Sequence, residues 1–150
     1  MQIVKFVNKS YKKKTDMMNL FFYIAERASF VSGFGISTYE IESVYCAFEY
    51  AKRYWNKDEE GKRQVRHLVV IFHNCELSID VVNEVAWNIA ALYGQRFQVF
   101  YGIHMDGKNP HIHFAINTVS YVDGLMFSER YGDLKRLKKN IEAICTNMKI

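Results

Sequence analysis

Three of the five histidines lie within ten consecutive residues, at positions 104, 111 and 113. Residues two apart on a β-strand project from the same face, about 6–7 Å from each other, so His111 and His113 have the spacing of two ligands of one cation. In a helix the same two side chains would diverge. The residues that alternate with them are apolar, which favours a half-buried strand: Ile112, Phe114 and Ile116.

A second β-rich segment, FQVFYGIH, precedes this strand and ends at His104. The residues between the two segments are turn formers: Asp106, Gly107, Asn109 and Pro110. The pattern predicts a hairpin that places His104 opposite the end of the strand that carries His111 and His113. Three neutral imidazoles with open coordination positions are typical of a catalytic metal site, because structural zinc sites are normally closed by four protein ligands. We therefore expect these three histidines to bind one divalent ion.

Three neighbours of the histidines have two readings each. Asp106 is either a turn former or a carboxylate that orients His104 and helps to neutralise the metal. Asn117 shares the face of His113 two pleats further on, where it would contact the substrate or support the site, or would simply end the strand. Gly102 lies one pleat before His104, and its missing side chain would let a substrate backbone approach or would mark a bulge.

The spacing H-x-D-x4-H-x-H-x3-N, with proline before the second histidine, resembles the metal motif of the relaxase/mobilisation nucleases. These are HUH endonucleases that nick plasmid or integrative-element DNA for conjugative transfer. The resemblance covers most of the chain, because other segments follow the order of the family: NKSYKK, MMNLFFYIAE, VRHLVVIFHNCELS and VSYVDGLMF. It implies a divalent cofactor, Mg²⁺ or Mn²⁺. It also implies binding of single-stranded DNA at an origin of transfer, with or without an accessory DNA-binding protein.

In the family that this chain resembles, a tyrosine attacks DNA phosphorus and forms a 5′-phosphotyrosyl link. Ten tyrosines are available, and Tyr23 in FFYIAE stands where the relaxase pattern carries its nucleophile. Helical periodicity places it at the edge of the buried stripe, which is also compatible with a core tyrosine. Tyr11, between basic residues, is the second candidate. Tyr131 is the third, and it would indicate a replication initiator or a single-strand transposase, whose tyrosine follows the histidines.

Basic residues gather near both ends of a chain whose net charge is +4. Charge runs are often only solvated surface, but two of them flanking a metal site favour phosphate binding. We expect five lysines to contact DNA: Lys12, Lys13, Lys135, Lys138 and Lys139. The three cysteines are far apart and form no CxxC pair, and no segment has the apolar length of a membrane span. These features predict a cytoplasmic protein with reduced thiols and no membrane partner.

The order of elements predicts a single α+β domain over residues 1–150, with helices packed on a central antiparallel sheet as in HUH relaxases. Strands are expected at QIVKFV, at residues 66–73 and in the histidine hairpin. Glycines 33 and 35 are expected to break the chain, and NKDEEGKRQ to form a mobile loop. Thr15 or Asp16 is expected to cap the first helix, which buries a stripe of apolar residues: Met17, Leu20, Phe21, Ile24 and Ala28.

Three further helices are expected. A capping box of Ser37 and Glu40 opens the second helix, whose inward residues are Ile41, Val44, Phe48, Ala51 and Trp55. The third runs from Ser78 to Gly94. The last exposes its basic cluster and buries one stripe: Leu134, Leu137, Ile141, Ile144 and Met148.

Two other classes of protein are compatible with parts of this pattern. A cupin-like metal oxygenase also uses HxH on a strand, but it expects a glutamate a few residues later, where this chain has Asn117, and it contains less helix. A non-catalytic DNA-binding module of the same fold would not need the three histidines together with an available tyrosine.

Overall fold

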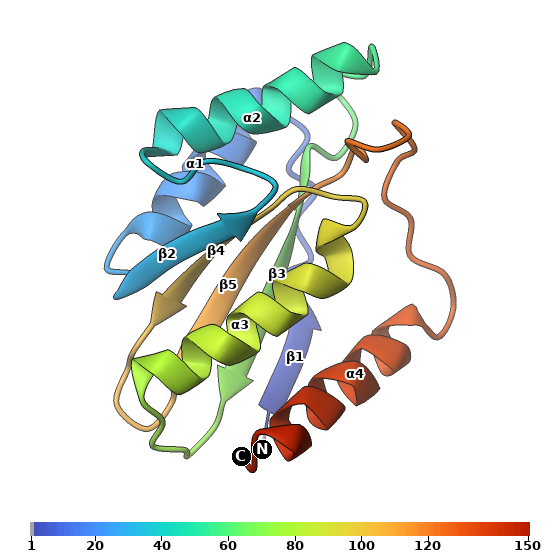
Figure 1. The fold of residues 1–150 in the computed structure, drawn as a ribbon. Coiled ribbons are helices and arrows are strands. Elements are labelled where there is room, and N and C mark those ends of the chain that lie inside the picture. Colours follow the sequence, from blue (N-terminus) through green and yellow to red (C-terminus); the bar gives the residue numbers. More distant parts are fainter. Residues whose placement is uncertain (1) are drawn as a thin grey trace.

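The computed structural model describes residues 2–150 (Figure 1). The elements in chain order are β1 (Gln2–Phe6), α1 (Lys14–Ala25), β2 (Phe30–Phe34), α2 (Ile41–Tyr54), β3 (Val65–Phe72), α3 (Ile79–Gly94), β4 (Val99–His104), β5 (His111–Asn117) and α4 (Asp133–Asn147). The five strands form one sheet in the order β1-β3-β5-β4-β2, and every neighbouring pair is antiparallel. The predicted α+β class and central antiparallel sheet are confirmed.

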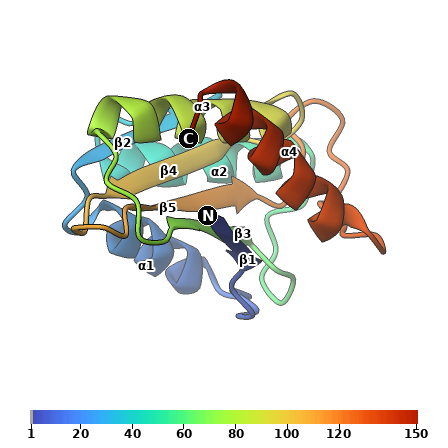
Figure 2. The same ribbon diagram turned by 90° about the horizontal axis from the view of Figure 1, so that it is seen from below.

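Each face of the sheet is covered by two helices. Alternate residues of β5 point to opposite faces, so Ile112 and Phe114 belong to a core with α3 and α4, whereas Ala115 belongs to a core with α1 and α2. Figure 2 shows α1 on one side of the sheet and α3 with α4 on the other. The histidines of the motif share the face of Ala115, and they therefore lie on the side of α1.

The first helix follows its predicted stripe: Met17, Leu20, Phe21 and Ile24 are buried. The predicted cap at Thr15 or Asp16 is wrong: the helix begins at Lys14 with Lys13 as its N-cap. The backbone N–H of Lys13 donates to the Asp16 carboxylate at 3.1 Å, and this contact closes the first turn. The helix ends at Ala25, so Ala28 lies beyond it.

The predicted start of α2 is wrong in detail, and that of α3 is confirmed. Glu40 is the N-cap of α2, and Ser37 instead accepts a hydrogen bond from the backbone N–H of Tyr39 at 3.5 Å in the preceding turn. Ser78 caps α3 by accepting from the N–H of Val81 at 3.3 Å, and α3 ends at Gly94.

A strand, β2, occupies the region where a chain break was expected. It pairs with β4 as a short edge strand, and Gly33 allows close contact there, since a Cβ at this position would lie 2.6 Å from the carbonyl oxygen of Val99. The segment FVSGF has no regular alternation of apolar and polar residues that would have predicted it.

The segment 56–64, expected to be a mobile loop, is hydrogen-bonded to the chain just before α1. The N–H of Gly61 donates to the carbonyl of Lys12 at 3.1 Å, and that of Gln64 to the carbonyl of Tyr11 at 2.8 Å. Across residues 2–150, no helix combines the length and the apolar character needed to cross a membrane.

Candidate metal centre and active site

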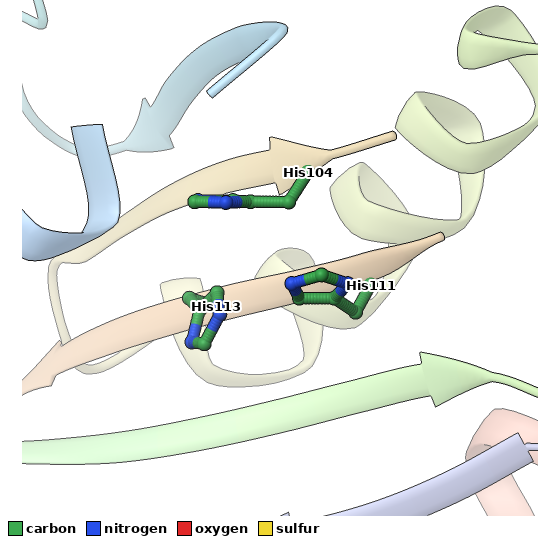
Figure 3. A group of neighbouring side chains, drawn as sticks. All are labelled: His104, His111 and His113. Atoms are coloured by element: carbon green, nitrogen blue, oxygen red, sulfur yellow. The ribbon is translucent and has the colours of Figure 1, made fainter. Parts of the chain in front are cut away.

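The three motif histidines converge on the α1 face of the β4–β5 hairpin. His104 pairs directly with His111 across the hairpin, and Gly102 pairs with His113, so all three imidazoles project from one face (Figure 3). One ring nitrogen from each residue can be chosen so that the three atoms all lie within 4.8 Å of one another. Period-two alternation and the predicted turn thus bring the histidines together as the sequence indicated.

Two of the imidazoles are oriented by backbone carbonyls. Nε2 of His104 lies 2.9 Å from the carbonyl oxygen of Ile24 in α1, and Nδ1 of His111 lies 3.1 Å from that of Asn109. A carbonyl only accepts, so each of these nitrogens carries the ring proton. In the neutral rings, Nδ1 of His104 and Nε2 of His111 then keep a lone pair for a metal ion.

The third imidazole is oriented by another histidine. Nδ1 of His113 lies 2.9 Å from Nε2 of His67 on β3, and Nδ1 of His67 lies 2.9 Å from the hydroxyl of Tyr11. Sequence reasoning missed His67. Within the sequence, His67 stands out only as a polar residue in the otherwise mostly apolar strand VRHLVVIF. Its contact with His113 could not be predicted, because it follows from the pairing of β3 with β5.

Burial keeps the inner histidines neutral. It lowers the pKa of His113 to about 3, with further lowering by His67, His104, His111 and Lys5. Burial likewise lowers the pKa of His67 to about 4, with smaller contributions from Lys5 and Lys9. Metal ligation requires the neutral imidazole. Three imidazoles that converge in this way therefore fit a divalent cation, and within residues 2–150 this candidate ligand group contains no carboxylate.

Tyr23 lies beside the histidines. Its ring stands edge-on to that of His113, with centroids 5.3 Å apart, and also approaches His67 at 6.1 Å. Tyr23 is 55% exposed and lines the same cavity as His111 and His113, so a substrate in this cavity can reach it. Helix α1 thus places this tyrosine next to the histidine cluster, on the same face of the sheet.

The two alternative tyrosines have different environments. Tyr11 is only 5% exposed, and its hydroxyl is engaged by His67. Tyr131 is fully exposed in the segment before α4, and α4 packs on the opposite face of the sheet from the histidines. Neither presents an accessible hydroxyl at the cluster.

Asp106 lines the same cavity as His111 and His113, whereas Asn117 does not. The carbonyl of Ile24, rather than Asp106, orients His104. The structure corrects the prediction that Asn117 serves the site: α2 covers this end of the sheet, Asn117 is fully buried, and its side-chain oxygen accepts from Lys52 at 2.6 Å. The side chain of Asn117 therefore supports the packing of α2.

A cavity of about 670 Å³ lies between α1, β1 and the histidine face. Its lining combines titratable, polar and apolar side chains: Lys5, Val7, Lys9, Tyr11, Asp16, Asn19, Leu20, Tyr23, His67, Val69, Ile71, Asp106, Asn109, His111 and His113. Lys5 was not anticipated in this position, because its place beside β3 depends on the pairing of β1.

The predicted DNA-binding lysines fall on two surfaces. Lys12 and Lys13 are exposed just before α1, next to Lys9 of the cavity wall. Lys135, Lys138 and Lys139 are exposed on α4, in the layer on the other side of the sheet.

The family model for the nuclease domain of MobA/VirD2-like relaxases matches residues 23–150. The chain belongs to this relaxase family. The match begins at Tyr23 and includes the whole histidine hairpin. The resemblance inferred from the motif is thereby confirmed, and the domain is a relaxase-type nuclease domain.

A solved structure shares the fold of this chain. This structure, from work on the molecular basis of vancomycin resistance transfer in Staphylococcus aureus, superposes with a TM-score of 0.55 and 13% sequence identity. The alignment covers 99% of this chain and 93% of the other. Among curated proteins, no sequence match was found.

Proposed function

We propose that this relaxase domain nicks single-stranded DNA at an origin of transfer, with Tyr23 as the nucleophile and His104, His111 and His113 as the ligands of a divalent ion. The observation that carries the proposal is the edge-on contact between Tyr23 and His113, 5.3 Å between ring centroids. It brings an accessible phenol to a cluster of oriented imidazoles in one cavity.

The proposed reaction is a transesterification. Oη of Tyr23 loses its proton and attacks a DNA phosphorus, an O–P bond forms, and the bond between phosphorus and the 3′ oxygen breaks. The 3′ oxygen leaves as a hydroxyl after it takes up a proton. One phosphodiester is exchanged for another, so the strand can be rejoined by the reverse step. The bound ion, Mg²⁺ or Mn²⁺, would polarise a phosphate oxygen and offset developing negative charge.

The chain's own charges suit an anionic substrate. Lys5 and Lys9 line the cavity beside the histidines, and Lys12 and Lys13 extend this basic surface toward the start of α1. We propose that this surface receives the DNA strand on the nucleophile's side. Lys135, Lys138 and Lys139 lie on α4, on the other side of the sheet, and would contact a more distant part of the DNA. Alternatively, an accessory DNA-binding protein would hold that part of the DNA. We propose that the protein acts in the cytoplasm, on the DNA found there.

A replication initiator or transposase arrangement is not favoured, because Tyr131 directly precedes α4, the helix that packs on the other face of the sheet from the histidines. The proposal is tested by incubating the protein with a labelled single-stranded oligonucleotide library, with Mn²⁺ or with EDTA. A denaturation-resistant adduct that requires Mn²⁺ is expected. Tight binding of the oligonucleotides without any adduct would instead identify a DNA-binding module.

A further inference from the structure

His67 lies in the cavity beside the metal ligands, and neither the metal motif nor the proposed nucleophile uses it. It connects two other side chains. Its Nε2 is 2.9 Å from Nδ1 of His113, and its Nδ1 is 2.9 Å from the Tyr11 hydroxyl. A buried metal ligand is thus joined through a second imidazole to a buried phenol.

One assignment of protons satisfies this chain while leaving His113 able to bind metal. For Nε2 of His113 to offer a lone pair, its Nδ1 must carry the ring proton and donate it to Nε2 of His67. The proton of His67 is then on Nδ1 and is donated to the oxygen of Tyr11. We propose that His67 and Tyr11 are positioning residues, a neutral hydrogen-bond chain that holds His113 in the Nδ1–H tautomer with Nε2 directed to the metal.

The position of Tyr11 is built by the surrounding chain. Its backbone has a left-handed φ of 47°, which is uncommon for an aromatic residue. Its carbonyl accepts from the N–H of Gln64 at 2.8 Å, and the carbonyl of the following residue, Lys12, accepts from Gly61 at 3.1 Å. The segment 56–64 thus fixes a strained residue whose hydroxyl meets His67.

This hydrogen-bond chain affects the net charge around the metal site. A metal-bound histidine is often supported by a carboxylate, which adds negative charge to the site. Here the supports of all three ligands are neutral: two backbone carbonyls and His67. The positive charge of a bound ion would remain available to the anionic phosphate. This inference rests on the metal site of the proposed function, but not on Tyr23 or on DNA.

Calorimetric titration with Mn²⁺ in the absence of DNA tests the inference. In His67→Leu the acceptor for His113 is lost, and the affinity should fall roughly 10–100-fold. His67→Gln keeps an oxygen that can accept from Nδ1–H and should restore most of the affinity. Tyr11→Phe removes only the outer hydrogen bond and should weaken binding roughly 2–10-fold. His73→Leu is the matched control, because His73 is exposed just beyond β3 and should bind Mn²⁺ like the wild type.

A second readout follows the tautomer itself. Long-range ¹H–¹⁵N spectra of the metal-free protein should show the Nδ1–H form of His113 in the wild type and in His67→Gln, and a mixture in His67→Leu. A predominant Nε2–H form in the wild type would overturn the inference, as would wild-type Mn²⁺ affinity in folded His67→Leu. If the wild type bound no Mn²⁺, the metal site of the proposed function would itself be refuted, and this inference with it.

Discussion

The imidazole of His104 donates a hydrogen bond to the backbone carbonyl of Ile24, with 2.9 Å between Nε2 and the oxygen. This contact joins a proposed metal ligand on β4 to the last turn of α1, the helix that carries Tyr23 one residue earlier. The distance between Tyr23, the proposed nucleophile, and the histidine cluster therefore depends on how closely α1 approaches the sheet.

Gly102 makes this approach possible, so its replacement should separate α1 from the histidines. A Cβ at position 102 would lie 2.7 Å from both the carbonyl oxygen and Cγ2 of Ile24, and one of the two elements must move. Neither of the two roles expected for Gly102 is found: α1 fills the space that a substrate backbone would need, and the pairing of β4 with β5 continues through Gly102 without a bulge. Gly102→Ala should cost about 1–3 kcal/mol in the free energy of unfolding and should weaken Mn²⁺ binding.

Urea unfolding and calorimetry measure the two effects of Gly102→Ala. The control is Gly107→Asn in the hairpin turn, where φ is 55° and no atom lies within 4 Å of an added Cβ. Asparagine tolerates this backbone, so both quantities should stay near the wild-type values. If Gly102→Ala behaved like this control, the close packing of α1 would not matter to the site.

The stability of the metal-free protein should fall as the pH decreases from about 6.5 toward 4. Burial lowers the pKa of His67 to about 4 and that of His113 to about 3, so below pH 6.5 the unfolded chain binds protons that the folded chain excludes. Stability rises with pH wherever the unfolded state binds more protons, and the contribution of these residues is complete above pH 6.5. The loss at pH 5 should be on the order of 2–4 kcal/mol for the two histidines together.

Urea unfolding in EDTA at pH 7 and pH 5 measures this dependence. Replacing His67 and His113 together by glutamine should make the curve markedly flatter, whereas His73→Gln should leave it unchanged. Parallel curves for the wild type and the double variant would contradict the assignment of the pH dependence to these two residues.

Asn117→Ala should destabilise the fold without affecting the metal site. Asn117 and Lys52 are both buried, and the lysine also donates to the carbonyl of Gln64 at 2.7 Å. Burial lowers the pKa of Lys52 to about 7. Loss of the amide leaves this amine with one acceptor fewer, at a cost of about 1–3 kcal/mol in the free energy of unfolding. If Asn117→Ala left stability unchanged but weakened Mn²⁺ binding, Asn117 would act in the metal site and not in the packing of α2.

The salt dependence of DNA binding should distinguish the two lysine surfaces. Each phosphate contact to a single strand contributes about −0.7 to the slope of log affinity against log salt concentration. Changing Lys9, Lys12 and Lys13 to alanine should flatten the slope the most, because these residues lie on the side of Tyr23. The same change at Lys135, Lys138 and Lys139 should have a smaller effect. A larger effect of the second set would place the main DNA path on α4.

The sequence predicted the histidine hairpin well, because alternation along β5 and the turn residues are local signals. It predicted α1 for the same reason, since Met17, Leu20, Phe21 and Ile24 recur with helical spacing. The role of His67 was not predictable, because it depends on β3 lying beside β5. Asn117 was placed on the correct face, but only the packing of α2 shows that this part of the face is closed.

The most direct test of the central claim is to locate the DNA-linked tyrosine. One cleavable oligonucleotide would be reacted with the wild type and with Tyr23→Phe, Tyr11→Phe and Tyr131→Phe, and the adduct would be digested and analysed by mass spectrometry. We expect the nucleotide on Tyr23, no adduct from Tyr23→Phe despite normal Mn²⁺ and DNA binding, and adducts from both other variants. A nucleotide on Tyr131, with Tyr23→Phe still reactive, would contradict the account and indicate the arrangement of a replication initiator or transposase.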